Sequence, residues 1–329
     1  MSRTVAEENA AFSYLEFGAI DPVAGSKTVW DFRTGETAYD WFMLARYAND
    51  LAAYQRLCSH LSDSDLDTLI SEYDSMIHHP DDFSVNLGKL LALGIAGAGQ
   101  PRPCFFEIGQ TLFGCVDGME FCKALLERLD ISFPKIDLHQ VQWTGLDISP
   151  LFNQLAPLLH PGHTITTFDD PGKLASRYDV FFAKGVTLLY AVRSVAALFD
   201  LLGRCQLSLF DYSLSLEEEQ HVVIGTGKPV VYLALAPFLA ACRASGKSLY
   251  LKRGNSRLDR TTGRVWLDAV YGAPELCRQF VEHDQRVRSA MRIGLLDLPG
   301  ERLLDTVGNR NSGWMTVEMF LSEQGVKTP

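Results

Sequence analysis

The chain has 329 residues, of which 47% are hydrophobic and 21% are charged, so it can bury a large core and is neither disordered nor a small disulfide-bonded domain. Its 30 basic and 40 acidic side chains give a net charge of −10. This balance argues against a nucleic-acid partner, because phosphate binding requires a dense positive surface. A small molecule is therefore the expected ligand.

The seven cysteines are spaced irregularly and include no C-x-x-C pair, which fits neither a zinc site nor a disulfide framework. The first ten residues contain Glu7 and Glu8 and lack the apolar core of a secretory signal. The most apolar run, 229–242, is shorter than the roughly 20 residues that cross a bilayer and contains Pro237. We therefore expect a cytoplasmic protein that does not use a membrane as partner.

Apolar residues recur at helical spacing from residue 37 to about residue 96, with one expected helix at 85–95. This pattern predicts an all-helical N-terminal segment, residues 1–100, which ends in the Gly- and Pro-rich stretch 97–103. Its first fifty residues are rich in aromatic side chains, which could line a cap over a ligand pocket or equally form ordinary core or a dimer contact. His78-His79 beside Asp81-Asp82 is not expected to bind a metal, because adjacent residues in a turn seldom converge on one ion.

From Cys104 onward short apolar strands alternate with helical stretches, which predicts an α/β domain at 101–329 with a mostly parallel sheet covered on both faces. Five strands are expected, at 104–109, 141–149, 164–170, 178–184 and 205–212. The expected helices lie at 118–129, 151–159, 187–202 and 229–244. Two further strands are expected to form an antiparallel closing hairpin, because a polar, glycine-containing link separates them. They lie at 248–253 and 264–271.

Acidic residues and glycines stand at the ends of the first three expected strands. The sequences there are Glu107-Ile108-Gly109 with Gly114, then Gly145-Leu146-Asp147-Ile148-Ser149, then Phe168-Asp169-Asp170. In this order, on five strand-helix units, they resemble the class I (Rossmann-like) S-adenosylmethionine-dependent methyltransferases. The resemblance covers 104–271, about half of the chain. It implies a Rossmann-like methyltransferase sheet, S-adenosylmethionine as cofactor, and transfer of its methyl group to a small-molecule acceptor.

The resemblance also implies roles for individual residues. Glu107 and Gly109 would lie beneath the methionine portion of the cofactor, where a glycine lets the chain pass close to the ligand. The two oxygens of Asp147 could accept both ribose hydroxyls. The adenine ring and its amino group would meet three further residues, Ile148, Asp169 and Asp170.

The sequence departs from the family pattern in two places. The glycine-rich turn usually has three glycines at alternate positions, which here hold Gly109, Thr111 and Phe113, with Gly114 one residue later. Asp147 lies 40 residues after Glu107, about twice the spacing of a compact strand-helix-strand unit. An inserted loop at 130–139 could absorb the excess, and Asp137 in that loop remains an alternative ribose ligand.

Methyl transfer from a sulfonium is an in-line displacement, so much of the catalysis can come from holding the acceptor in a site that excludes water. A base is needed only if the acceptor carries a proton. Lys184 could orient an anionic acceptor, and His221 has the type of side chain that accepts a proton near neutral pH. The full set of catalytic candidates near the fourth and fifth strands is Lys184, Asp211, Tyr212 and His221.

Two other functions remain open. One is a nicotinamide-dependent oxidoreductase on a similar sheet, although the turn lacks the stricter G-x-G-x-x-G of that class. The other is a non-catalytic binding protein that kept the sheet, which the incomplete glycine turn would suit. The identity of the methylated atom and the oligomeric state, including a homodimer, are not determined by the sequence.

Overall fold

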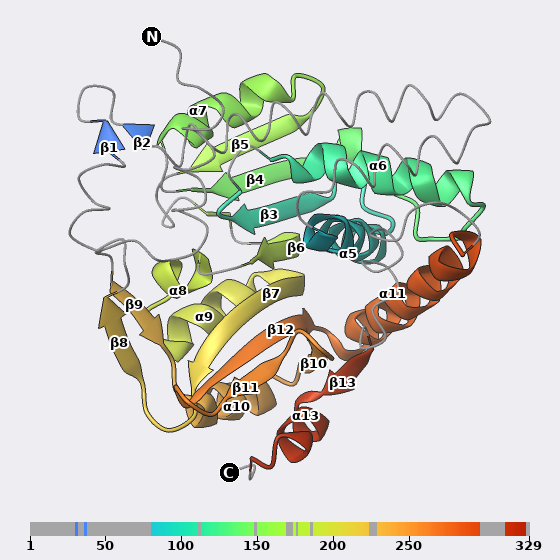
Figure 1. Ribbon diagram of the computed structural model, residues 1–329. Coiled ribbons are helices and arrows are strands. Elements are labelled where there is room, and N and C mark those ends of the chain that lie inside the picture. Colours follow the sequence, from blue (N-terminus) through green and yellow to red (C-terminus); the bar gives the residue numbers. More distant parts are fainter. Residues whose placement is uncertain are drawn as a thin grey trace, which may run out of the picture.

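The computed structural model describes residues 30–31, 36–37, 80–110, 113–147, 150–168, 174–175, 177–184, 187–223, 229–296 and 313–326. Its centre is a nine-stranded sheet in the order β13-β10-β12-β7-β6-β3-β4-β5, with β11 paired to β12 (Figure 1). The expected α/β class, with a mostly parallel sheet and antiparallel closing strands, is confirmed.

Five parallel strands form one half of the sheet. In spatial order they are β5 (Thr164–Phe168), β4 (Gln142–Leu146), β3 (Cys104–Ile108), β6 (Tyr178–Ala183) and β7 (Cys205–Ser215). The chain builds outward from β3, first through β4 to β5 and then, on the other side, through β6 to β7. The strand order therefore reverses between β3 and β6. In open α/β sheets a ligand crevice lies at such a reversal, outside the carboxyl ends of the strands.

Antiparallel strands complete the other half. β12 (Arg264–Gly272) lies between β7 and β10 (Ser248–Lys252) and runs antiparallel to both, as expected for the closing pair. The link between them contains a short strand, β11 (Arg257–Asp259), which pairs with β12. The sequence analysis did not anticipate β13 (Trp314–Thr316), which extends the edge beyond β10.

Helices cover both faces of the sheet (Figure 1). One face packs against α5 (Pro80–Ala96), α6 (Cys115–Arg128) and α11 (Pro274–Gly294). The other face packs against α8 (Thr187–Ala191), α9 (Val195–Gly203), α10 (Leu235–Ala244) and α13 (Val317–Glu323). Side chains alternate along each strand, so Phe182 and Leu209 meet the first set while Phe181 and Phe210 meet the second. A further helix, α7 (Pro150–Leu159), packs along β5.

Two expected helices were wrong in part. The one expected at 187–202 is divided into α8 and α9, because the Ser194 side chain accepts a hydrogen bond from the Ala197 N–H (3.1 Å) and starts a new helix. The one expected at 229–244 begins with a strand, β9 (Pro229–Tyr232), which pairs with β8 (Gln220–Val223). β-branched Val230 and Val231 favour this extended start.

The N-terminal segment also differs from the expectation. β1 (Trp30–Asp31) and β2 (Glu36–Thr37) form a short antiparallel pair, so these residues are not helical. Helix α5 packs against α6, β6 and β7, so it covers the sheet and the proposed division at residue 100 does not separate it from the α/β domain. The other expected features of residues 1–79 lie outside the described residues.

Three histidines gather at the amino ends of β4 and β5. The rings of His139 and His163 stack with centroids 4.6 Å apart, and the His160 ring meets His163 edge-on at 6.3 Å. Burial lowers the pKa of His163, and the neighbouring His139 and His160 lower it further, although the Leu138 carbonyl and Asp137 oppose them. The folded state therefore disfavours a proton on His163.

This cluster predicts a specific loss of stability in mild acid. Below a pH of about 6.5 the unfolded chain binds a proton at residue 163 more readily than the folded chain, so the free energy of unfolding falls. His163→Gln should reduce this pH dependence between about pH 7.5 and 5.5, as measured by urea unfolding. His221→Gln, which changes an exposed histidine on β8, is the control. Equal slopes for wild type and His163→Gln would contradict the prediction.

Candidate functional site

The turn after β3 has the backbone geometry that the sequence led us to expect. Gly109 has a φ of +72°, where glycine is favoured, and its N–H donates to the Leu146 carbonyl at the end of β4 (2.8 Å). Phe113, at a position where the family usually has glycine, is also left-handed with a φ of 54°. Its fully buried ring packs edge-on to Trp143 (6.2 Å). Burial of this ring opposes the backbone strain of a non-glycine residue there.

The carboxylate of Glu107 is held by a lysine that the sequence analysis missed. Lys89 Nζ, from α5, lies 2.9 and 3.0 Å from the two Glu107 oxygens. Both residues are buried, 3% and 7% exposed. The same ammonium lies 3.8 Å from the centre of the Phe182 ring on β6. Burial, and then the charge of Glu107, raise the pKa of the Cys115 thiol, which donates to Glu107 Oε2 (3.4 Å).

A polar network fixes the end of β4. The Asp147 carbonyl accepts a hydrogen bond from Asn153 Nδ2 (2.9 Å), and Asn153 Oδ1 accepts one from Gln110 Nε2 (3.0 Å). Gln110 is only 2% exposed and lies against Gly145, where a Cβ would come within 2.6 Å of the Gln110 side chain. Asp147 itself is 8% exposed. Glu107 is the last residue but one of β3, and Asp147 directly follows the last residue of β4. The two carboxylates thus lie at the carboxyl ends of adjacent strands.

The alternative ribose ligand, Asp137, lies at the opposite edge of the sheet. It precedes β4, and its side chain accepts a hydrogen bond from the His139 N–H (3.0 Å), which caps the short 3-10 helix Leu138–Gln140. It is therefore not placed to meet a ligand at the carboxyl end of β4. The three residues expected near the adenine, Ile148, Asp169 and Asp170, lie outside the described residues.

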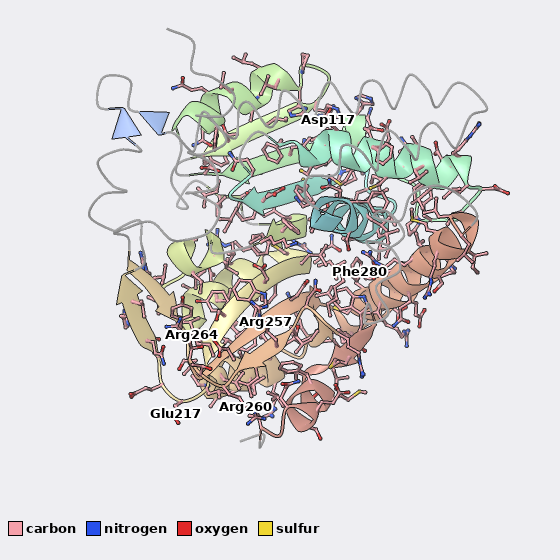
Figure 2. All side chains as sticks on the ribbon, in the orientation of Figure 1. Asp117, Glu217, Arg257, Arg260, Arg264 and Phe280 are labelled. Atoms are coloured by element: carbon pink, nitrogen blue, oxygen red, sulfur yellow. The ribbon has the colours of Figure 1, made fainter. Side chains whose placement is uncertain are left out.

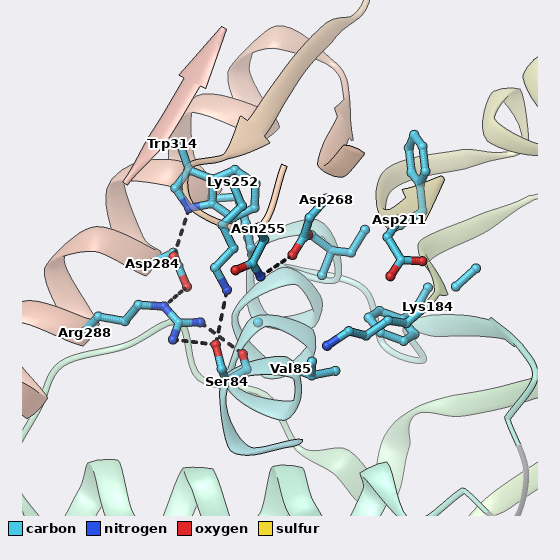
Figure 3. A pocket seen from close by; sticks show the side chains of 16 residues that line it. Ser84, Val85, Lys184, Asp211, Lys252, Asn255, Asp268, Asp284, Arg288 and Trp314 are labelled. Carbon is cyan, nitrogen blue, oxygen red and sulfur yellow. Dashed lines mark hydrogen bonds and ion pairs between the residues drawn. The ribbon is translucent and has the colours of Figure 1, made fainter. Parts of the chain in front are cut away.

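A row of charged side chains crosses the sheet beside this crevice. Asp211 on β7 is directly opposite Asp268 on β12, and Lys252 on β10 pairs with Trp314 on β13. The strand registers place Lys184, just after β6, level with Asp211, and place Lys252 level with Asp268. All five side chains line one cavity of about 50 Å³ (Figure 3). The sequence analysis identified Lys184 and Asp211 as catalytic candidates but did not identify Asp268 or Trp314.

Helices α5 and α11 cover this row. Arg288 Nε donates to Asp284 Oδ1 (2.7 Å), and its other nitrogens donate to the hydroxyl and carbonyl oxygens of Ser84 (2.9 and 3.0 Å). Lys252 Nζ also donates to the Ser84 hydroxyl (3.2 Å), and Trp314 Nε1 donates to Asp284 Oδ2 (2.9 Å). Burial of Lys252 lowers its pKa, and the charge of Arg288 lowers it further. Asp268 and Asp284 act in the opposite direction, but the net shift of the pKa is downward. Figure 3 shows the contacts of Arg288 and Lys252 meeting at Ser84 in α5, and those of Arg288 and Trp314 meeting at Asp284 in α11.

Two catalytic candidates lie away from the cavity. Tyr212 is on the opposite face of β7 from Asp211, fully buried, and its hydroxyl donates to the Val231 carbonyl (3.0 Å). Burial raises its pKa, and Glu219 raises it further. His221 is exposed on β8 and contacts Glu219 (2.9 Å). Neither side chain lines the cavity, so we do not assign either of them a role in the reaction.

The arginines that follow Lys252 do not join it. Arg264 lies over the Tyr232 ring (3.8 Å), and Arg260 donates to the Gln324 carbonyl (2.7 Å). Figure 2 shows Arg257, Arg260 and Arg264 in the lower part of the molecule, around β11 and β12, and Asp117 on α6 in the upper part. Within the part of the chain that the structure describes, no group of three or more His, Cys, Asp or Glu side chains could hold a metal ion, and no helix is long and apolar enough to cross a membrane.

No family model and no curated protein matches the sequence. Solved structures with partial similarity include the N-terminal domain of EvdMO1 in the presence of SAH and D-fucose, at 16% identity and a TM-score of 0.40 over 60% of this chain and 84% of that one. They also include the CurJ carbon methyltransferase, at 15% identity and a TM-score of 0.36 over 72% of this chain and 73% of that one. A third is an O-methyltransferase from a trans-AT PKS multienzyme of Brevibacillus brevis in complex with S-adenosyl-L-homocysteine. It matches at 9% identity and a TM-score of 0.39 over 69% of this chain and 84% of that one. Because these TM-scores lie below 0.5, we transfer no residue role or activity from these proteins.

The buried pair predicts a large effect of a single substitution. Lys89→Met leaves the Glu107 carboxylate buried without its counter-charge and should lower the free energy of unfolding by about 3–5 kcal/mol in urea titrations. Adding Glu107→Gln should restore part of this loss, because a neutral amide needs no counter-charge.

The matched control is Lys135→Met. Lys135 pairs with Glu127 at the same 2.9 Å and also lies over an aromatic ring, but both charged side chains are exposed. Its loss should cost less than about 1 kcal/mol. Similar decreases in the free energy of unfolding for the two lysine variants would show that the buried Lys89–Glu107 pair stabilises the protein no more than an exposed pair.

Proposed function

We propose that this protein is an S-adenosylmethionine-dependent methyltransferase that acts on a small-molecule acceptor. The observation that carries the proposal is the pair of buried carboxylates, Glu107 and Asp147, at the ends of adjacent strands beside the reversal of strand order. Gly109 supplies the tight turn between them. These are the residue types, in the places, that the resemblance implies for binding the cofactor.

The charge of this edge favours S-adenosylmethionine over a nicotinamide dinucleotide. S-adenosylmethionine carries a sulfonium and an ammonium against a single carboxylate, so it is a net cation, whereas the dinucleotide carries a pyrophosphate. A pyrophosphate normally sits at the N-terminus of the helix after the first strand. Here that helix, α6, has Asp117 in its first turn, which disfavours an anion there. Thr111 also stands where the dinucleotide motif has its second glycine.

Different residues would bind the cofactor and position the acceptor. Gly109 would let the backbone approach the methionine portion, and Asp147 would accept the ribose hydroxyls. The bound cofactor would supply an electrophilic methyl group on its sulfonium sulfur. Lys184 and Asp211, in the cavity next to the crevice, would orient the acceptor, and the Asp211 carboxylate could accept a proton from it.

We further propose that the protein works in the cytoplasm. Six of its seven cysteines lie in the described residues, and all six are free thiols, which is the state favoured by a reducing compartment. We also propose that the N-terminal segment, residues 1–100, caps the acceptor pocket of the domain at 101–329.

The first test is ligand-dependent stability. S-adenosylhomocysteine at about 100 times its dissociation constant should raise the free energy of unfolding by roughly 2.7 kcal/mol and increase the thermal midpoint. NAD and NADP are the comparison ligands in the same thermal scans. A shift with a dinucleotide and none with S-adenosylhomocysteine would replace the proposal with an oxidoreductase.

The second test concerns Asp147. Asp147→Asn keeps the shape of the side chain but loses its charge and exchanges one acceptor oxygen for a donor. A hydrogen bond to a charged group contributes about 1.5–3 kcal/mol, so affinity for S-adenosylhomocysteine should fall about tenfold to a hundredfold by calorimetry. Asp137→Asn, at the other edge of the sheet, should leave affinity unchanged. Weaker binding by Asp137→Asn alone would move the ribose contact away from Asp147.

A further inference from the structure

Asp147 directly follows β4, and both of its backbone polar groups are held by hydrogen bonds. Its N–H donates to the Phe168 carbonyl at the end of β5 (3.2 Å), and its carbonyl accepts from Asn153 Nδ2 (2.9 Å). Asn153 lies in the first turn of α7. Because both peptide groups of Asp147 are held, the direction in which its side chain leaves the backbone is restricted as well.

Asn153 is itself held at two further points. Its backbone carbonyl accepts from the Thr167 hydroxyl on β5 (2.7 Å), and its Oδ1 accepts from Gln110 Nε2 (3.0 Å). Asn153 therefore connects the turn after β3, the end of β4 and the end of β5. A residue with these three contacts has little freedom to turn away from Asp147.

The hydrogen bonds determine how the two side-chain amides are oriented. A carbonyl oxygen can only accept, so the Asn153 group that faces the Asp147 carbonyl must be its NH₂. The oxygen of Asn153 then faces Gln110, which must present its own NH₂. The two amides thus form a directed chain that ends at the backbone of Asp147.

The other end of the Gln110 amide indicates a role besides stability. Gln110 is only 2% exposed, and among the described residues no donor lies within hydrogen-bond distance of its Oε1. A buried acceptor without a donor destabilises a fold, and an apolar side chain of similar size would avoid this cost. Gly145 leaves space for the Gln110 side chain, which a Cβ at residue 145 would approach within 2.6 Å. The contact that this arrangement provides is the one with Asn153.

We propose that Asn153 is a positioning residue for cofactor binding. By holding the backbone of Asp147 it directs the carboxylate toward the ribose hydroxyls, and Gln110 keeps the Asn153 amide in the orientation that this contact needs. The inference rests on the proposed methyltransferase function, in which Asp147 accepts the ribose hydroxyls. Since Asn153 acts through Asp147, its effect on binding is confined to the part of the ligand that Asp147 recognises.

The test compares adenosine with 2′,3′-dideoxyadenosine, which lacks both ribose hydroxyls, by ligand-observed NMR on the full chain. The wild-type protein should bind adenosine about tenfold or more tightly than the dideoxy form, as expected for hydrogen bonds to a charged group. Asn153→Leu removes the amide and keeps a similar shape. It should weaken adenosine binding about tenfold and dideoxyadenosine binding less than about twofold. Gln110→Met should reduce the preference for adenosine by a smaller factor.

The matched control is Gln206→Met. Gln206 also donates from its side-chain amide to a residue of the sheet, the carboxylate of Asp179, but at the amino ends of β6 and β7. Its loss should leave the preference for adenosine unchanged. Thermal unfolding checks the fold of every variant, and calorimetry measures S-adenosylhomocysteine binding on the same samples.

The remaining outcomes separate this inference from the proposed function. The inference is wrong, and the cofactor assignment stands, if the wild-type protein binds S-adenosylhomocysteine but does not prefer adenosine. The same holds if Asn153→Leu keeps the preference or weakens both nucleosides equally, because Asn153 would then have only a structural role. If Asn153→Leu does not fold, an unchanged preference in Gln110→Met overturns the inference. If the wild-type protein does not bind S-adenosylhomocysteine, the proposed function fails and this inference fails with it.

Discussion

Helix α5 supplies partners to buried charges on both sides of β6. Lys89 neutralises Glu107 at the end of β3, and Ser84, little more than one turn earlier, accepts hydrogen bonds from Arg288 and Lys252 beside the cavity. A buried charge without its partner costs several kcal/mol, so both groups of charges depend on α5 being docked against the sheet. Both groups of buried charges therefore lie on the face of the sheet that this helix closes.

The same contacts connect the crevice to the cavity. Phe182 forms part of the cavity wall, and the Lys89 ammonium lies over its ring while pairing with Glu107. A movement of α5 that lengthened the Lys89–Glu107 contact would also displace Ser84 from Arg288. One helix, α5, therefore contacts both the proposed cofactor crevice and the proposed acceptor cavity. This arrangement would hold the two proposed ligands at a fixed distance and orientation.

The sequence was sufficient for the elements that local pattern determines. Apolar runs with turn residues located all five parallel strands within a few residues, and Gly109 and Asp147 were placed correctly at strand ends. It was insufficient where distant segments decide. Nothing local shows that Lys89, the one basic residue of α5, pairs with a residue 18 positions later. Nor does it show that Asp268 and Lys252 join Asp211 through strand register. Tyr212 and Asp211 are neighbours in sequence, and only the alternation of β7 separates the core face from the cavity face.

The two halves of the sheet supply different groups of polar side chains. The parallel half ends in Glu107, Asp147 and the Gly109 turn, which are the groups that we propose to lie at the cofactor. The antiparallel half, with α11 and β13 added to it, supplies five of the residues that line the cavity, namely Lys252, Asp268, Asp284, Arg288 and Trp314. Arg288 of α11 donates to Ser84 of α5, and the same helix holds Glu107 through Lys89, so the two halves are connected through α5. The proposed acceptor cavity is likewise built from both halves, because Lys184 and Asp211 of the parallel half line it together with these later residues.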